Sequence, residues 1–441
     1  MAFSSGAVWE YQTGGNQNYG GGFDSTISGA GTDYSQQVTT ALASTDLACA
    51  TGTSTLTSAT GGFTSAMVGN AVNIVSGTNF TAGFYFITGY TNGNTVTLDR
   101  SPVGGSSGSS GVGNVGGCLL VPIDAHFEAF VAGNKVWIKT GSYTITASIA
   151  VASTSATVGN PIVVEGYYSS RADMPIESNL PSLTCGAYSI TFGIFWRVGY
   201  LSGTGTTSPV FASNSSGGAV FDHCKVLNNS TSADRTALFL RNSIAYSCNL
   251  ASTNGYAVYS DTSQQSMLIF CNLHDSKNGC TGVFASFVIQ GCAIHNCSVA
   301  AFTTGSAKNT IFLSIIYDCV GGVKFVNYGY SSIVNCIISG NTTGISQNAN
   351  YVTNFAYNCL FYDNDTNASN FALDSSNVTG SDPLFTDPEN GDFTLQSGSP
   401  ALNAGFDFTK IGLTGAYKLN IGIDQDDNVV AGGTTCHMSA F

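Results

Sequence analysis

The chain has 441 residues, and only 9% of them are charged, whereas an ordinary globular domain has about 25%. Its formal net charge at pH 7 is −13, and Arg100 is the only basic residue before Lys135. Nucleic-acid binding requires clustered lysine and arginine, so the composition excludes it, and anionic polymers are disfavoured as ligands unless a cation bridges them. Hydrophobic residues at 43% and aromatic residues at 11% can support a folded core, which argues against disorder.

Residues 1–45 are rich in Gly, Asn, Gln and Tyr and have little apolar surface to bury. They predict an extended N-terminal arm, which is either ordered against a partner or a loose terminus. Residues 1–10 lack the basic and apolar segments of a signal peptide, and no apolar run is long enough to span a membrane. We therefore expect synthesis in a cytoplasm and no membrane insertion. If the protein acts outside the cell, release within a virus particle is one route.

Residues 46–103 predict a small antiparallel β module. A hairpin turn is expected at Asn92 and Gly93. The module contains no cluster of titratable groups, so its composition favours an assembly or attachment role over chemistry. Its strands are expected at residues 67–75, 83–88 and 95–98.

Residues 104–130 predict a flexible Gly/Ser linker or a long loop, followed by a short helix. Such a helix would cover the open end of the repeat that follows, because exposed strand edges invite aggregation.

An internal repeat of 21–24 residues dominates the second half of the chain. Each period has a small anchor residue, an apolar residue two positions later and a turn-forming residue four positions later. The alternation predicts a strand and the turn residue predicts its end. Stacking such units closes the sheet hydrogen bonds, so residues 131–400 predict an all-β, right-handed parallel β-helix. The anchors are Cys224, Cys248, Cys271, Cys292, Ser314, Cys336 and Cys359.

The six anchor cysteines are predicted to form an internal ladder of buried thiols, because cysteine is small, apolar and often buried. The chain has 13 cysteines, an odd number, and no pair separated by two residues. The only closely spaced pair is Cys292 and Cys297, with four residues between them, and this pair hardly resembles zinc ligands. The sequence thus favours a reduced ladder over a disulfide framework, and it predicts no metal site and no cofactor.

Prolines mark the end of the repeat, with three of them in residues 381–400. Proline cannot donate to a strand ladder, so the β-helix is expected to end there. Residues 401–441 are then expected to form a C-terminal cap over the last coil.

A row of rings follows the anchors on the outer face of successive coils. Its members are His274, His295, Tyr317 and, further on, Tyr362. One interpretation is a glycan-binding stripe, because flat rings suit the faces of pyranose sugars. The other is ordinary ladder stacking on a solvated face. The turn row beside it is interpreted as structural, since its side chains satisfy backbone groups; it holds Asn228, Asp275, Asn296, Asp318 and Asp363.

A catalytic constellation is not apparent in the sequence, and no catalytic residue is assigned. A lyase would need acidic residues for calcium and a basic residue beside them, and the lysines and arginines of the repeat are scattered. A glycosidase would need two carboxylates at a set separation. Asp363 and Asp365 are the candidates, and their setting is more typical of a turn.

Two stretches resemble the pectate-lyase-like superfamily of right-handed β-helix proteins. Residues 134–144 are similar to its first coil, and residues 382–405 resemble its closing segment. This resemblance implies the fold but no single activity, because the fold hosts lyases, hydrolases, adhesins and viral spikes.

The N-terminal half looks like the leading region of β-helix proteins encoded by tailed bacteriophages. The resemblance implies a virion protein, such as a tailspike, fibre or capsid decoration, and such proteins are commonly homotrimers. It is carried by residues 9–23, 57–70 and 77–83.

The first hypothesis is therefore a structural virion protein of a phage. It would contact other virion proteins through the arm and meet host surface polysaccharide. The alternatives are a polysaccharide lyase or glycoside hydrolase and, secondly, a bacterial surface adhesin.

Overall fold

The computed structural model describes residues 4–405, apart from 152–155, 172, 208, 216, 262–264, 283–285, 306–307, 327–329, 349–353 and 403. The predicted C-terminal cap at 401–441 therefore lies almost wholly outside the described residues. The chain divides into two compact units, which are described separately: Met1–Cys185 with Gly193–Ser202, and Gly186–Phe192 with Gly203–Phe441. No described helix is long and apolar enough to cross a membrane.

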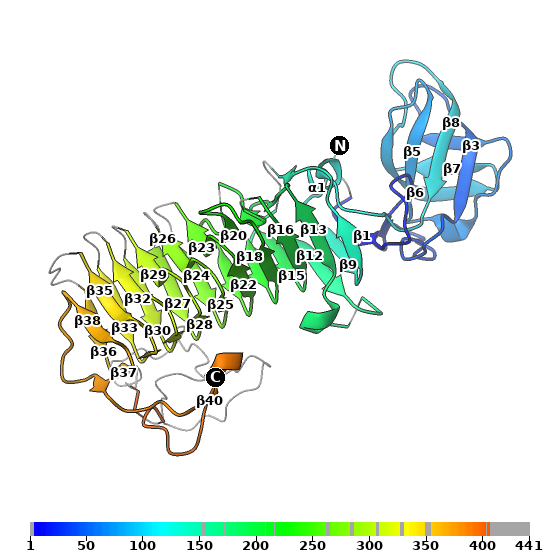
Figure 1. Cartoon of the computed structure of the whole chain (residues 1–441). Helices are drawn as coiled ribbons and strands as arrows, with labels where there is room; N and C mark the ends of the chain where they lie inside the picture. The colour runs from blue at the N-terminus through cyan, green and yellow to red at the C-terminus, as the bar shows by residue number, and fades with distance from the viewer. Residues whose placement is uncertain are drawn as a thin grey trace. The chain divides into compact units, whose positions relative to one another are not determined.

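The first unit contains a closed antiparallel barrel with the strand order β3-β4-β7-β6-β5-β8 (Figure 1). Its core includes Leu47, Ile74 and Val96, which are at most 1% exposed. The antiparallel module predicted from the sequence is therefore present, but it is longer than 46–103. The strands are β3 (Leu42–Cys49), β4 (Thr55–Ser58), β5 (Ala71–Thr78), β6 (Gly83–Asn92), β7 (Thr95–Leu98) and β8 (Gly108–Val115), with a 3₁₀ turn at Ser65–Met67.

The prediction of a flexible linker was wrong for β8, which pairs with both β3 and β5 and closes the barrel. Its glycines are needed because the strand lies directly against Leu47. A Cβ atom added at Gly111 or Gly113 would stand 2.8 Å from atoms of that side chain. A glycine-rich composition therefore marks a close approach of backbone here and not a loop.

The N-terminal segment is extended, but it packs on its own chain. Strand β1 (Ala7–Tyr11) pairs in parallel with β9 (Lys135–Lys139) and antiparallel with β2 (Gly22–Asp24). The interpretation of residues 1–45 as an arm held by a partner is corrected for this strand, whose partner is the first coil. The short helix expected at 124–130 is present as α1 (Asp124–Phe127), and Phe127 stacks on Trp196 at 5.4 Å.

The first unit also contains the opening coils of a solenoid. Parallel pairing joins β9 to β12, β12 to β15, and β10 to β13. The elements are β10 (Ser142–Thr144), β11 (Ile149–Ala150), β12 (Ile162–Tyr167), β13 (Ser182–Gly186) and β15 (Trp196–Gly199), with a 3₁₀ turn at Glu177–Asn179.

The second unit is a parallel β-helix of about seven turns of roughly 23 residues, as the repeat predicts. Each turn contributes one strand to each of three sheets (Figure 1). Sheet 1 contains β18 (Val220–Asp222), β21 (Ile244–Tyr246), β24 (Gln265–Ile269), β27 (Ser286–Gln290), β30 (Asn309–Phe312), β33 (Ser331–Val334) and β36 (Phe355–Tyr357). Sheet 2 contains β16 (Ser202–Gly205), β19 (Lys225–Asn228), β22 (Asn249–Ser252), β25 (Asn272–His274), β28 (Ala293–His295), β31 (Ile315–Tyr317), β34 (Ile337–Ser339), β37 (Leu360–Tyr362) and β39 (Val378–Thr379). Sheet 3 contains β14 (Ile190–Phe192), β17 (Phe211–Ser213), β20 (Thr236–Phe239), β23 (Tyr256–Ser260), β26 (Asn278–Gly282), β29 (Ala300–Thr304), β32 (Gly321–Phe325), β35 (Thr343–Gln347) and β38 (Thr366–Ser369).

The six anchor cysteines lie inside this solenoid and are at most 2% exposed. All twelve cysteines of the described residues are free thiols. The Sγ of Cys292 donates to the carbonyl oxygen of Gln290 at 3.3 Å, and its neighbours in the ladder bond in the same way. Burial raises the pKa of Cys292 and of Cys336 well above that of a free thiol, so these side chains are neutral.

Candidate functional site

The outer row predicted from the sequence is brought together on sheet 2. His274 is in register with His295, and His295 with Tyr317. Tyr362 lies two rungs beyond Tyr317, with Ser339 between them. The two imidazole rings stack with their centroids 5.4 Å apart and their planes 16° from parallel. The row is therefore a continuous feature of five coils.

A C-terminal hairpin covers the middle of this row. Strands β40 (Phe385–Asp387) and β41 (Asp392–Leu395) are antiparallel and joined through a 3₁₀ turn at Pro388–Asn390. The Phe393 ring meets His295 edge-on at 5.2 Å and Tyr317 at 5.5 Å. His295 is consequently only 6% exposed, so the interpretation of the whole row as an open stripe or a solvated face is wrong at this residue.

The apolar column beneath the hairpin explains why the hairpin lies there. On the outer face of sheet 2, the position after each anchor is polar or charged in β19, β22 and β25 and then becomes apolar. The apolar members pack with Phe385 and Phe393 in one buried cluster. This change of polarity was visible in the sequence and could have predicted a covering segment. The series runs Lys225, Asn249, Asn272, Ala293, Ile315, Ile337 and Leu360.

The two histidines have different surroundings. The ring nitrogens of His274 lie 2.8 Å from Asp275 Oδ2 and 2.7 Å from Asn249 Oδ1. His295 Nε2 lies 2.9 Å from Asn272 Oδ1, and its Nδ1 has no hydrogen-bond partner in the described part of the chain. Burial lowers the pKa of His295 to about 4, and the neighbouring His274 acts in the same direction.

Acid is therefore expected to destabilise the covered end of the solenoid. Between pH 6.5 and about 4 the unfolded chain binds a proton at His295 and the folded chain does not, so stability falls as the pH falls through that window. The full shift corresponds to about 3 kcal/mol. Thermal melts of the wild type and of His295→Phe across this range measure it. The variant keeps a ring against Phe393 and should lack this part of the pH dependence. If the wild type and the variant show the same change of melting temperature with pH, His295 is not the group responsible.

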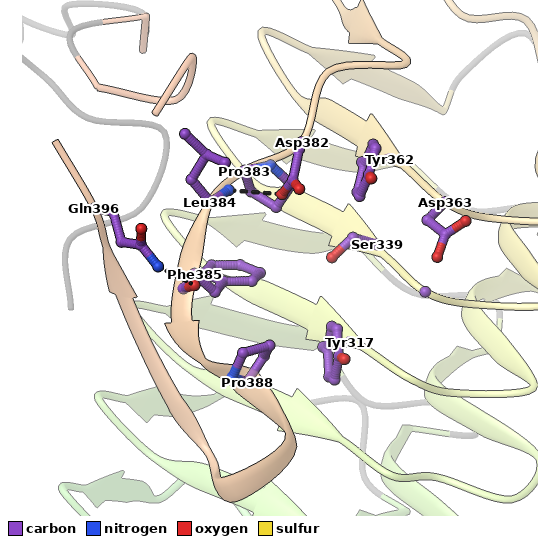
Figure 2. Close-up of a pocket in the computed structure, with 11 residues that line it drawn as sticks. Tyr317, Ser339, Tyr362, Asp363, Asp382, Pro383, Leu384, Phe385, Pro388 and Gln396 are labelled. Atoms are coloured by element: carbon purple, nitrogen blue, oxygen red, sulfur yellow. Dashed lines mark hydrogen bonds between the residues drawn. The ribbon is translucent and has the colours of Figure 1, made fainter. Parts of the chain in front are cut away.

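An open groove remains between the hairpin and the end of the row. Its volume is about 320 Å³, and its polar lining includes Tyr317, Ser339, Tyr362, Asp363, Asp382 and Gln396. Figure 2 shows Tyr362 between the two carboxylates, with Phe385 on the hairpin side. The hairpin itself supplies Phe385 and Gln396, so the groove exists only because the hairpin is in place.

The groove carries two acidic side chains, Asp363 and Asp382. The negative charges of Asp382 and Asp363 raise the pKa of Tyr362. Asp363 lies in the turn after β37 with φ of 50°, as the turn row predicts, and Asp382 accepts a hydrogen bond from the Leu384 amide at 2.8 Å. Among the described residues, no lysine or arginine lines the groove, and Asp365 does not line it either. Among the described residues no group of three His, Cys, Asp or Glu could hold a metal ion.

Sequence reasoning placed Asp363 and the two tyrosines near one another but missed Asp382, which follows the repeat. Asp382 precedes the first proline of the closing segment, and only the return of that segment onto sheet 2 brings it to Tyr362. The structure does not bring His274 into the groove.

Comparisons with known proteins give one sequence match and several matches of fold. Residues 287–407 match the domain of unknown function DUF5123. The search of curated proteins returned no match. The chain is similar to the pectate lyase Pel9A, with 12% identity, a TM-score of 0.45 and coverage of 74% of this chain and 91% of that one.

Two further solved structures show the range of similar proteins. The PL6 family alginate lyase AlyGC has 11% identity and a TM-score of 0.41, over 58% of this chain and 39% of that one. ORF18 of Geobacillus virus E2 has 14% identity and a TM-score of 0.31, over 52% of this chain and 54% of that one. The protein is a parallel β-helix. Its similar structures are pectate-lyase-like β-helix proteins.

Proposed function

We propose that the protein is a structural β-helix protein that binds a neutral surface polysaccharide in the groove beside Tyr317 and Tyr362. The observation that carries the proposal is the composition of that groove. Two tyrosines and two carboxylates line one open space of about 320 Å³, and the described lining residues include no lysine or arginine. Tyrosine rings pack against the C–H faces of a sugar, and carboxylates accept hydrogen bonds from its hydroxyl groups.

Charge favours a neutral ligand over an anionic one. Asp363 and Asp382 face the same space, and the chain as a whole carries a net charge of −13. A uronic-acid polymer would bring more negative charge to this space, where the lining residues that the structure describes offer no positive partner, and this is unfavourable. A chain of neutral hexoses meets no such repulsion and can use every polar atom of the groove.

The further proposal is that the protein belongs to a phage virion and acts as a homotrimer. It is supported by the resemblance of the N-terminal half to phage β-helix proteins. The barrel formed by residues 42–115 is the proposed attachment module to other virion proteins, in place of the free arm, because strand β1 is already paired within the chain.

Replacing Tyr362 by alanine is expected to weaken polysaccharide binding about fivefold, since one ring contact contributes about 1 kcal/mol. Affinity electrophoresis in gels containing dextran, mannan or a neutral O-antigen measures the loss, with polygalacturonate as the anionic comparison. Tyr357→Ala is the matched control, because that tyrosine is 41% exposed on sheet 1 and does not line the groove. Equal retardation of both variants, or stronger retardation by polygalacturonate, would count against the proposal.

A glycoside hydrolase is the second candidate, and one observation favours it: Asp363 and Asp382 line the same groove. Two carboxylates across a glycosidic bond are the equipment of most glycosidases, one as the acid and the other as the base or nucleophile. Incubation of the full chain with the same polysaccharides and assay of new reducing ends tests it. The hydrolase would be established if the wild type releases reducing ends and if Asp363→Asn and Asp382→Asn each abolish that release while still binding the polysaccharide.

A further inference from the structure

A second aromatic cluster lies on the outer face of sheet 3, where the repeat gave no signal. Phe239 of β20 is in register with Tyr259 of β23, and their rings stack at 5.4 Å with planes 15° apart. The ring of Tyr256 contacts that of Tyr259, with a distance of 5.2 Å between their centroids. The residues between them, such as Val258, point into the core and are fully buried. On the next coil the column continues with Thr281, so the cluster is confined to two coils.

These rings form one wall of a pocket of about 350 Å³. The remaining lining comes from Pro209, Asp234 and Thr236. A space of this size accepts a small organic ligand, and a wall of rings with a few polar groups is the usual composition of such sites. The Tyr256 hydroxyl lies 3.4 Å from Asp234 Oδ1.

Two cations near the pocket, Lys277 and Arg241, are already paired with carboxylates. Lys277 Nζ donates to Asp234 Oδ1 at 2.7 Å. The Arg241 guanidinium lies 4.0 Å from the centre of the Phe239 ring and is 3.1 Å from Asp261 Oδ1. Lys277 and Arg241 therefore each have a carboxylate partner, and the pocket has polar atoms to offer a ligand.

We propose that this pocket is a saccharide-binding site that takes one neutral pyranose unit. The rings of Tyr256 and Tyr259 would pack against the C–H face of the sugar, while Asp234 and the tyrosine hydroxyls bond to its hydroxyl groups. An apolar ligand would leave Asp234 without new partners, and a charged one would have to break an existing ion pair. The site is on another sheet from the groove beside Tyr362, and the proposal stands independently of that groove.

The test is ligand-observed NMR on the full chain with the methyl pyranosides of glucose, galactose, mannose and N-acetylglucosamine. At least one should bind with a dissociation constant of about 1 mM, the affinity that a ligand of this size supports. Tyr259→Ala is expected to lower the affinity at least tenfold. Asp234→Asn, at an exposed position, should lower it as well. Tyr330→Ala, at a tyrosine that is 64% exposed outside both lined spaces, should not.

Two results would overturn this site. One is the absence of binding by all four pyranosides. The other is binding that survives Tyr259→Ala and Asp234→Asn. Binding that is lost only with Tyr362→Ala would place the sugar in the groove on sheet 2, which supports the proposed function and rejects the pocket on sheet 3.

Discussion

Arginine in place of Cys292 is expected to leave the protein without its folded second unit. The side chain of Cys292 is fully buried in the ladder between Cys271 and Ser314. A guanidinium group there has neither the space of a solvent-facing position nor a carboxylate partner in the ladder. Burying an unpaired guanidinium costs several kcal/mol, and forcing a long side chain into a packed core adds to that cost, so the total is comparable to the stability of about 5–15 kcal/mol of a whole domain. Circular dichroism and limited proteolysis of the purified variant would show the loss.

Cys292→Ser is the matched control for that variant. The next rung already holds Ser314, whose hydroxyl donates to the Phe312 carbonyl at 3.0 Å and accepts from the Cys292 amide at 3.2 Å. A second serine can bond in the same way, so the cost should be about 1–2 kcal/mol. If the arginine variant melts at the temperature of the wild type, position 292 does not face the interior.

The solenoid was predictable because its physics is local and repeated. One small inward residue per turn, with alternation around it, fixes which face is buried, and stacking fixes the rest. The backbone conformation between sheets 1 and 2 was harder to predict from the sequence. Phe270 and Leu313 precede their anchors with φ near 52°, a conformation that residue type does not suggest. Stacking of identical turns imposes this conformation, and a bulky residue carries the strain.

Tertiary pairing explains the parts that sequence reasoning missed. The glycine-rich strand β8 (Gly108–Val115) has the composition of a linker, and only its closeness to Leu47 shows why glycine is required. Similarly, Tyr362 belongs to the repeat and Asp382 to the closing segment that follows it. Only the packing of the hairpin on sheet 2 brings the two residues together. The candidate groove was therefore half predictable: the tyrosines follow from the repeat, whereas the covering strand and its carboxylate do not.

Glu10 explains why the N-terminal segment cannot be a loose arm. This carboxylate is fully buried on β1, and Arg171 Nε donates to its Oε2 at 2.7 Å. The Tyr167 hydroxyl and the Gln12 amide donate to Oε1. Arg171 also donates to Asp33 Oδ2 at 2.8 Å, so one guanidinium holds two parts of the N-terminal segment. Burial raises the pKa of Glu10, and the charge of Arg171 opposes that rise.

Arg171→Ala is therefore expected to destabilise the first unit by about 3–5 kcal/mol, because it leaves a buried carboxylate without its cation. Without the arginine the pKa of Glu10 rises further, and a group with a raised folded pKa loses stability as the pH increases. The variant should thus recover part of its stability between pH 7 and pH 5. Urea unfolding at both pH values measures the effect, with Arg197→Ala as a control at an exposed arginine of the same unit.

The double variant Glu10→Gln/Arg171→Ala separates the charge from the packing. A glutamine keeps the shape of Glu10 and can still accept hydrogen bonds from Tyr167 and Gln12. If the uncompensated charge is the main cost, the double variant will be more stable than Arg171→Ala alone at pH 7 and will lose its pH dependence. If both variants are equally destabilised, the cost lies in the lost contacts to Asp33 and Ser35, and the N-terminal segment is held by the guanidinium itself rather than by the neutralisation of Glu10.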